Sequence, residues 1–235
     1  MKNFTFRKIA AAAVLFASAS ASHASLILIA PENFGGTGLG AVNTILTIQG
    51  RNNAASEAGG VGYAATGDFI TGTDAKTGNS QTQTRSLGQL GITSGSTLRV
   101  VFNATENDNL INLTGLTLTI YDLTGVARFV ANLDKAYNNL STQSGIGNSG
   151  FVFGLNQAEA LEAQQNVFSQ AGFQQFRLGL SALATGFSGG NETFFAANSA
   201  AGGGGAAGGT VPEPGTVALI GLALGGLALS RRKRA

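Results

Sequence analysis

Short segments in which hydrophobic and polar residues alternate recur along the middle of the chain. In the clearest, residues 116–121, aliphatic side chains alternate with Thr and Tyr. This period of two is typical of a β-strand with one buried face. Further segments rich in β-branched or alternating residues predict strands at 42–49, 98–103, 126–130, 151–153, 176–180 and 193–196. Clusters of Gly, Asn, Asp and Ser separate them, as expected for turns.

One segment has a different pattern. Asn156 is a favoured N-cap residue, and Glu159 stands three positions later, as in a capping box. Apolar residues follow at helical spacing, and Gly172 occupies a position suited to a C-cap. The pattern predicts one helix over 157–171. Short strands joined by turns predict a mainly β body at 25–198, an antiparallel β-sandwich or jelly-roll-like fold. The order of the strands stays open.

The first 24 residues have the three parts of a secretory signal peptide. A basic segment contains Lys2, Arg7 and Lys8, and an apolar core follows at 9–17. The small residues at 22 and 24 then predict cleavage by signal peptidase between Ala24 and Ser25. A membrane anchor is the alternative, but nine apolar residues fall far short of the ~20 that span a bilayer.

The last 25 residues also form a three-part pattern. Pro212, Glu213 and Pro214 precede an unbroken apolar run at 217–229, and a Gly/Ala-rich linker at 199–210 precedes all of them. The apolar run predicts a short transmembrane helix of about 20 Å, which snorkelling basic residues would help to seat. Under the positive-inside rule, the cytoplasmic end is the basic cluster Arg231, Arg232, Lys233 and Arg234.

This tail resembles the PEP-CTERM sorting signal of Gram-negative bacteria over about residues 211–235. The resemblance implies recognition by an exosortase, a membrane transpeptidase-like enzyme that removes the tail during transfer to the cell exterior. It also implies a bacterium that makes extracellular polysaccharide. Pro212, Glu213 and Pro214 would be the recognition residues, as parts of a substrate and not of a catalyst. A permanent single-span anchor is the alternative.

The composition excludes several kinds of catalytic, metal and nucleic-acid-binding site in the body. Cys and Trp are absent, and the single His, His23, lies in the predicted signal peptide. Disulfides, zinc sites built on Cys or His, and Ser–His or Cys nucleophiles are therefore excluded. Residues 25–211 contain seven basic and eleven acidic residues, a net charge of −4. Such a body lacks the basic stripe that a nucleic-acid partner requires.

Two groups of oxygen-bearing side chains remain as candidates for chemistry. One could supply Ca²⁺ ligands, although its spacing fits no EF-hand loop and its members are also ordinary turn formers: Asn103, Glu106, Asp108 and Asn109. The other is the carboxylate pair Glu159 and Glu162, a glycosidase-like combination. Its spacing places both on one helix face near the start, where acids are favoured for electrostatic reasons alone.

The leading hypothesis is a non-enzymatic protein without a cofactor, exported through the inner membrane and sorted by an exosortase. It would act at the cell surface or in the extracellular matrix, associated with exopolysaccharide or biofilm. One alternative is a carbohydrate-binding module or adhesin, with or without Ca²⁺. Another is a secreted glycoside hydrolase that uses only carboxylates.

Overall fold

The computed structural model describes residues 24–32, 42–50, 56–78, 81–104, 110–141, 149–186 and 190–199. Strands dominate these residues: β1 (Ala24–Glu32), β2 (Thr44–Ile48), β3 (Ser56–Ala64), β4 (Gly67–Thr71), β5 (Arg85–Ser86), β6 (Leu98–Ala104), β7 (Leu110–Tyr121), β8 (Ala127–Leu133), β9 (Tyr137–Ser141), β10 (Ser149–Leu155), β11 (Arg177–Thr185) and β12 (Glu192–Asn198). The helical elements are α1 (Gln157–Ala163), the π-helix η2 (Gln164–Phe168) and the 3₁₀ turns η1 (Gly95–Thr97) and η3 (Phe173–Gln175).

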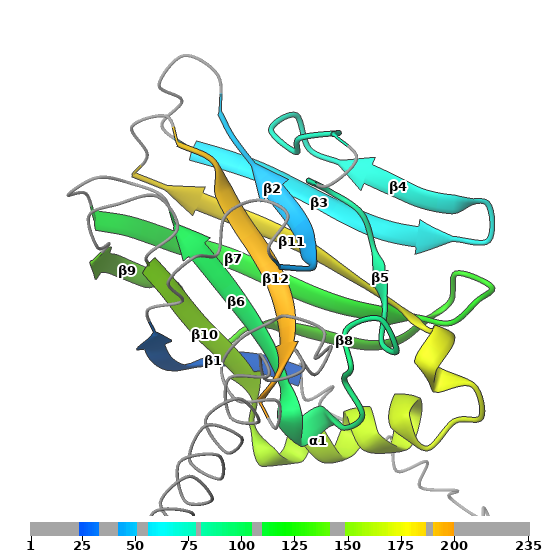
Figure 1. Ribbon diagram of the computed structural model, residues 1–235. Helices are drawn as coiled ribbons and strands as arrows, with labels where there is room; N and C mark the ends of the chain where they lie inside the picture. Colours follow the sequence, from blue (N-terminus) through cyan, green and yellow to red (C-terminus); the bar gives the residue numbers. More distant parts are fainter. Residues whose placement is uncertain are drawn as a thin grey trace, which may run out of the picture.

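The strands form one twelve-stranded sheet that curls on itself (Figure 1). Its hydrogen-bonded order is β2-β12-β6-β10-β1-β8-β7-β11-β3-β4, with β5 added to β11 and β9 added to β7. Every pairing is antiparallel except that of β1 with β8. The mainly β class is therefore confirmed. The two halves face one another as the layers of a sandwich do, but they are joined through β1.

Strand β1 holds the two halves together. It pairs antiparallel with β10 and parallel with β8, and its register shifts between Leu28 and Ala30. Leu26 is completely buried. The backbone N–H of Leu28 donates to the hydroxyl of Tyr137, at 3.0 Å. Because β1 is the first strand in the described part of the chain yet lies mid-sheet, the sheet is complete only once this segment has docked.

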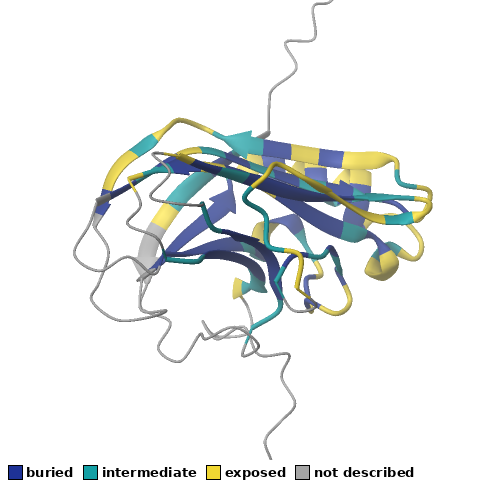
Figure 2. Ribbon diagram, turned by 90° about the horizontal axis from the view of Figure 1, so that it is seen from above, coloured by how far each residue is buried: buried dark blue, intermediate teal, exposed yellow. Residues whose placement is uncertain are grey.

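The core lies inside the curl, between the two halves of the sheet. Phe102 on β6 stacks against Phe194 on β12, with ring centroids 4.6 Å apart. Strands β3 and β2 approach closely across the core, because a Cβ added to Gly59 on β3 would lie 2.8 Å from the Ile48 side chain on β2. Buried positions run along the strands of both halves, and exposed positions gather at turns and on an outer layer (Figure 2).

A second, smaller apolar cluster lies on the other face of β6, β10 and β12. It contains the buried residues Val101, Val152 and Phe195. Val101 lies on the face of β6 opposite Val100 and Phe102, and it is only 1% exposed. This part of the sheet is therefore buried on both faces.

The helical segment begins as predicted and ends early. The Asn156 side chain accepts hydrogen bonds from the backbone N–H groups of Ala158 and Glu159, which is the expected N-cap. The end predicted at residue 171 is wrong. After Ala163 the turns widen to π-helical geometry, with the N–H of Ser169 bonded to the carbonyl of Gln164, and helical structure stops at Phe168.

The predicted strands at 98–103, 116–121, 126–130, 151–153, 176–180 and 193–196 correspond to β6, β7, β8, β10, β11 and β12, and 42–49 contains β2. No helix in the part of the chain that the structure describes is long and apolar enough to cross a membrane. The transmembrane helix predicted at 217–229 lies outside the described residues.

Candidate functional site

The residues of the predicted sorting signal follow the last strand of the body. Strand β12 pairs with β6 and ends at Asn198. The described residues end at 199. Pro212, Glu213 and Pro214 lie outside the described residues, as do the linker from residue 200 onward and the basic cluster at 231–234. Their roles stay predictions from the sequence.

The predicted signal-peptidase site coincides with the start of β1. Ala24 pairs with Ala131 of β8 and Ser25 with Asn132, in the parallel ladder. The next residue, Leu26, is paired on both sides and buried in the core. A backbone held in this way cannot also lie extended in a peptidase groove. Cleavage at this bond would therefore have to precede the docking of β1.

The structure describes only Asn103 among the four Ca²⁺ candidates. It lies near the end of β6 and is 2% exposed, between Gly150 of β10 and Thr193 of β12. The other three, Glu106, Asp108 and Asn109, lie outside the described residues. Within the described ranges, no group of three or more His, Cys, Asp or Glu side chains could hold a metal ion. Calcium binding stays a prediction.

The two helix carboxylates differ in environment. Glu159 is 4% exposed and belongs to the buried side of α1, whereas Glu162 is exposed. One therefore faces the body and the other faces solvent, so they do not form the shared pair that acid–base cleavage of a glycoside needs. Only the N-cap half of the anticipated capping box is present, because Oε2 of Glu159 makes no hydrogen bond.

Asp122 is the most strongly hydrogen-bonded carboxylate among the described residues, and its role is structural. Oδ1 accepts from the N–H and hydroxyl of Thr124, at 2.8 and 2.6 Å, and from the N–H of Val126, at 3.0 Å. Oδ2 accepts from Nε of Arg128 at 2.8 Å and pairs with its Nη2 at 2.7 Å. Burial alone raises the pKa of Asp122, but these bonds outweigh it and lower that pKa to about 2.

A second polar cluster lies where β4, β5 and β11 converge. Arg177 donates to the side-chain and backbone oxygens of Thr84, at 2.9 and 2.7 Å, and lies 3.7 Å from a carboxylate oxygen of Asp68. Its guanidinium also lies 5.5 Å from the centre of the Tyr63 ring. Burial, and then the positive charge of Arg177, lower the pKa of Arg85. All these groups are engaged with one another, which indicates a structural role.

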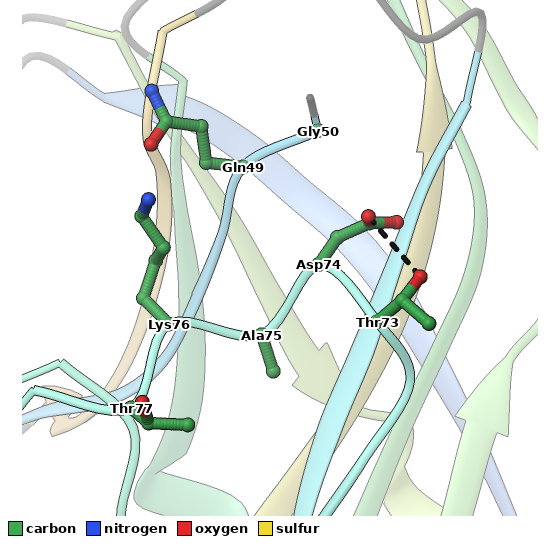
Figure 3. Close-up of a pocket in the computed structure, with 7 residues that line it drawn as sticks. All are labelled: Gln49, Gly50, Thr73, Asp74, Ala75, Lys76 and Thr77. Carbon is green, nitrogen blue, oxygen red and sulfur yellow. Dashed lines mark hydrogen bonds between the residues drawn. The ribbon is translucent and has the colours of Figure 1, made fainter. Parts of the chain in front are cut away.

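The largest hollow that we describe, of about 470 Å³, lies at the end of β2 (Figure 3). Its wall is the segment after β4, which bonds to Gln49 through the backbone of Asp74. Oδ2 of Asp74 accepts the N–H of Ala58 at 2.9 Å, and Thr73 donates to Oδ1. Asp74 and Lys76 point apart, with Lys76 directed toward Gln49 (Figure 3). The hollow can accept a polar group, but it lacks a paired acid and base.

A smaller hollow of about 150 Å³ lies on the outer face of the sheet, across β4, β3, β11 and β7. We call it the outer groove. It is lined by nine residues, none of them charged, and two aromatic rings, Phe69 and Tyr121, belong to it. Sequence reasoning missed it because the glycine-rich stretch that forms β3 resembles a loop. The sequence holds no signal for it, because the strands that pair with Gly60 and Gly62 are known only from the structure.

Comparison with known families decides the nature of the tail. Residues 210–234 match the family described as the PEP-CTERM protein-sorting motif. The chain therefore carries a PEP-CTERM protein-sorting motif. The match covers the Pro-Glu-Pro triplet, the apolar run and the basic cluster. No curated protein and no solved structure matches the chain.

The PEP-CTERM motif indicates a protein that is exported and sorted to the cell surface or the exterior, with an exosortase as its processing partner. The family match covers the tail and leaves the β-rich body unassigned. What the body does must therefore be argued from its own surface.

Proposed function

We propose that this chain is a non-enzymatic structural or adhesive protein that an exosortase delivers to the cell surface or the polysaccharide matrix. The match of residues 210–234 to the sorting motif carries the proposal. The body contributes a stable β scaffold, held by a continuous apolar core and by engaged polar clusters.

Each part of the tail has a physical role in this proposal. Proline restricts φ to near −65° and disfavours helix in the residue before it, so we expect the Pro-Glu-Pro triplet to favour an extended segment outside the membrane. The apolar run at 217–229 holds the substrate in the bilayer, and the four following cations resist translocation. From its composition we expect the Gly/Ala linker at 199–210 to have an r.m.s. span of about 20 Å, which would keep the body clear of the membrane during processing.

The absence of an enzymatic role is part of the proposal. It is supported by a composition without Cys, by a single His within the predicted signal peptide, and by the separation of Glu159 from Glu162. A reducing-sugar release assay on purified protein tests it. Release of sugar that Glu159→Gln abolishes would favour the carboxylate-based glycoside hydrolase instead.

The sorting proposal is tested by two changes to the tail. Replacement of Pro212, Glu213 and Pro214 by Ala leaves the signal peptide intact, so the protein should still cross the inner membrane. The uncleaved apolar run should then retain it in that membrane. Deletion of residues 211–235 should release the body into the periplasm instead. Normal arrival of the triple-Ala variant at the cell surface would contradict exosortase recognition of the triplet.

A further inference from the structure

The outer groove owes its shape to glycines on two adjacent strands. A Cβ added to Gly62 on β3 would lie 2.3 Å from Cζ of Phe69, so the outer end of this ring lies over the Gly62 backbone. A Cβ added to Gly179 on β11 would lie 3.2 Å from Cε2 of Tyr121. Larger residues at Gly62 or Gly179 would displace these rings. The glycines therefore let two aromatic rings lie across neighbouring strands.

Hydroxyl groups surround the rings and are available to a ligand. Thr71, Thr119 and Ser181 line the groove, and a Cβ on Gly60 would lie 2.7 Å from Oγ1 of Thr71. None of the three hydroxyls makes a hydrogen bond to a residue within the described ranges, in contrast to Thr117, which donates to Asn132 at 2.8 Å. They can therefore donate to and accept from a bound molecule.

The lining favours one class of ligand. The groove contains no charged residue, so it offers no counter-charge to an acidic polymer or a nucleic acid. Phe69 is 45% exposed and presents apolar surface beside free hydroxyls. A pyranose ring has the complementary pattern, with C–H groups on its faces and hydroxyl groups around its rim. A surface hollow across strands also accepts a polymer in mid-chain, without needing its end.

Two other occupants fit less well. A second copy of the chain would need about 800 Å² of contact surface on each partner, far more than this small hollow supplies. Peptide addition by strand pairing would extend the sheet at the end strand β4, beside the groove, and would not fill a hollow that lies across the paired strands β3, β11 and β7. These arguments leave a neutral glycan.

We propose that the outer groove binds a neutral polysaccharide, with Phe69 and Tyr121 contacting the faces of sugar rings and Thr71, Thr119 and Ser181 bonding their hydroxyls. This inference rests on the proposed extracellular role, because the sorted protein meets such polymers outside the cell. It assigns that role to one face of the body. Ca²⁺ takes no part at this groove, since no carboxylate lines it.

The test uses exported protein purified from the producing cells. Calorimetric titration measures binding to dextran, hydroxyethyl cellulose and galactomannan as neutral probes, and to alginate as an acidic probe, each with and without EDTA. We expect binding to at least one neutral probe, unchanged by EDTA. Failure to bind any neutral probe, or binding to alginate alone, would overturn the proposal.

Variants then locate the binding surface. Phe69→Ala and Tyr121→Ala should each weaken binding about tenfold, since each removes apolar surface that the sugar would cover. Leu183→Ala is the matched control, because Leu183 is 42% exposed on the same strand as Ser181 but does not line the groove. It should change the affinity less than twofold. Equal affinity for all variants would place binding elsewhere and overturn the assignment.

Folding, sorting and glycan binding are measured by different experiments. Phe69 lies on the end strand β4, so Phe69→Ala should keep the far-UV spectrum of the native protein. The binding assay also works on detergent-extracted protein that retains its tail. A failure of sorting would therefore appear in the mass of the protein, and a failure of glycan binding would appear in the titration.

Discussion

Asp122 fixes the turn between β7 and β8, and its replacement by Asn tests how much one buried carboxylate stabilises the body. The side chain is 5% exposed and accepts bonds from Thr124, Val126 and Arg128. Asn keeps the shape and one acceptor oxygen but removes the charge that pairs with Arg128. A folded-state pKa of about 2 against an ordinary 3.8 corresponds to about 2 kcal/mol of stability at neutral pH. For a body of this size that is roughly 4–8 °C in Tm.

The sign of the pH dependence follows from the lowered pKa. The stabilisation by Asp122 is fully present above about pH 4, where the unfolded carboxylate is also ionised, and it is lost as the pH falls through about 2. Urea unfolding of wild type and Asp122→Asn, followed by circular dichroism at pH 7, 4 and 2, measures this. The difference between the two proteins should be largest at pH 7 and nearly vanish at pH 2.

The matched control is Glu162→Gln, which neutralises an exposed helix carboxylate. Surface changes of this kind usually alter stability by less than about 0.5 kcal/mol, so this variant should follow wild type at every pH. The reasoning would be refuted by an Asp122→Asn variant as stable as wild type at pH 7. A stability difference that stays constant down to pH 2 would equally refute the lowered pKa.

Four further substitutions test the fold, each by thermal unfolding of the exported protein. Asn156→Ala removes the N-cap of α1 and should cost about 1 kcal/mol, with an unchanged Tm counting against the cap. Gly179→Ala should cost about 1–3 kcal/mol, because its Cβ would lie 2.3 Å from the Val61 carbonyl oxygen. Gly115→Ala, whose Cβ first meets a side chain at 3.3 Å, should cost clearly less, and the reverse order would contradict this contact. Phe102→Ala should cost about 3–5 kcal/mol, since it opens a cavity beside the stacked rings of β6 and β12, and a loss under 1 kcal/mol would argue against that packing.

The local features of the fold could be predicted because they depend on neighbouring residues. Hydrophobic and polar residues alternate at 116–121 because one face of the strand is buried and the other is not. This segment forms the end of β7. The Asn156 cap depends on backbone N–H groups two and three positions later. The helix end at residue 171 was wrong because the widening into a π-helix leaves no mark in the spacing of apolar residues.

The missed strands depend on distant partners. Gly-rich β3 has little strand propensity of its own, and it is a strand because β11 and β4 pair with it on either side. Strand β1 was missed because residues 26–30 form an unbroken apolar run without alternation, which does not by itself distinguish a strand from other buried segments. Its position between β10 and β8, which makes the sheet continuous, is set by contacts more than a hundred residues away.

The two candidate sites also differ in how far the sequence predicts them. The sorting tail can be predicted from the sequence, because its three parts, the Pro-Glu-Pro triplet, the apolar run and the basic cluster, follow one another along the chain. The outer groove is not readable, since it requires Gly62, Gly179, Phe69 and Tyr121 to meet from four strands. Its residues stand out only once the register of those strands is known.

The central claim is that the tail is a sorting signal that an exosortase removes. The intact mass of the surface protein tests this claim most directly. Mass spectrometry of protein taken from the cell surface gives both ends of the chain at once. We predict a species whose C-terminus lies upstream of, or within, Pro212-Glu213-Pro214, so that the apolar run at 217–229 is absent. A surface species that still carries Arg231, Arg232, Lys233 and Arg234 would contradict the account and indicate a permanent anchor.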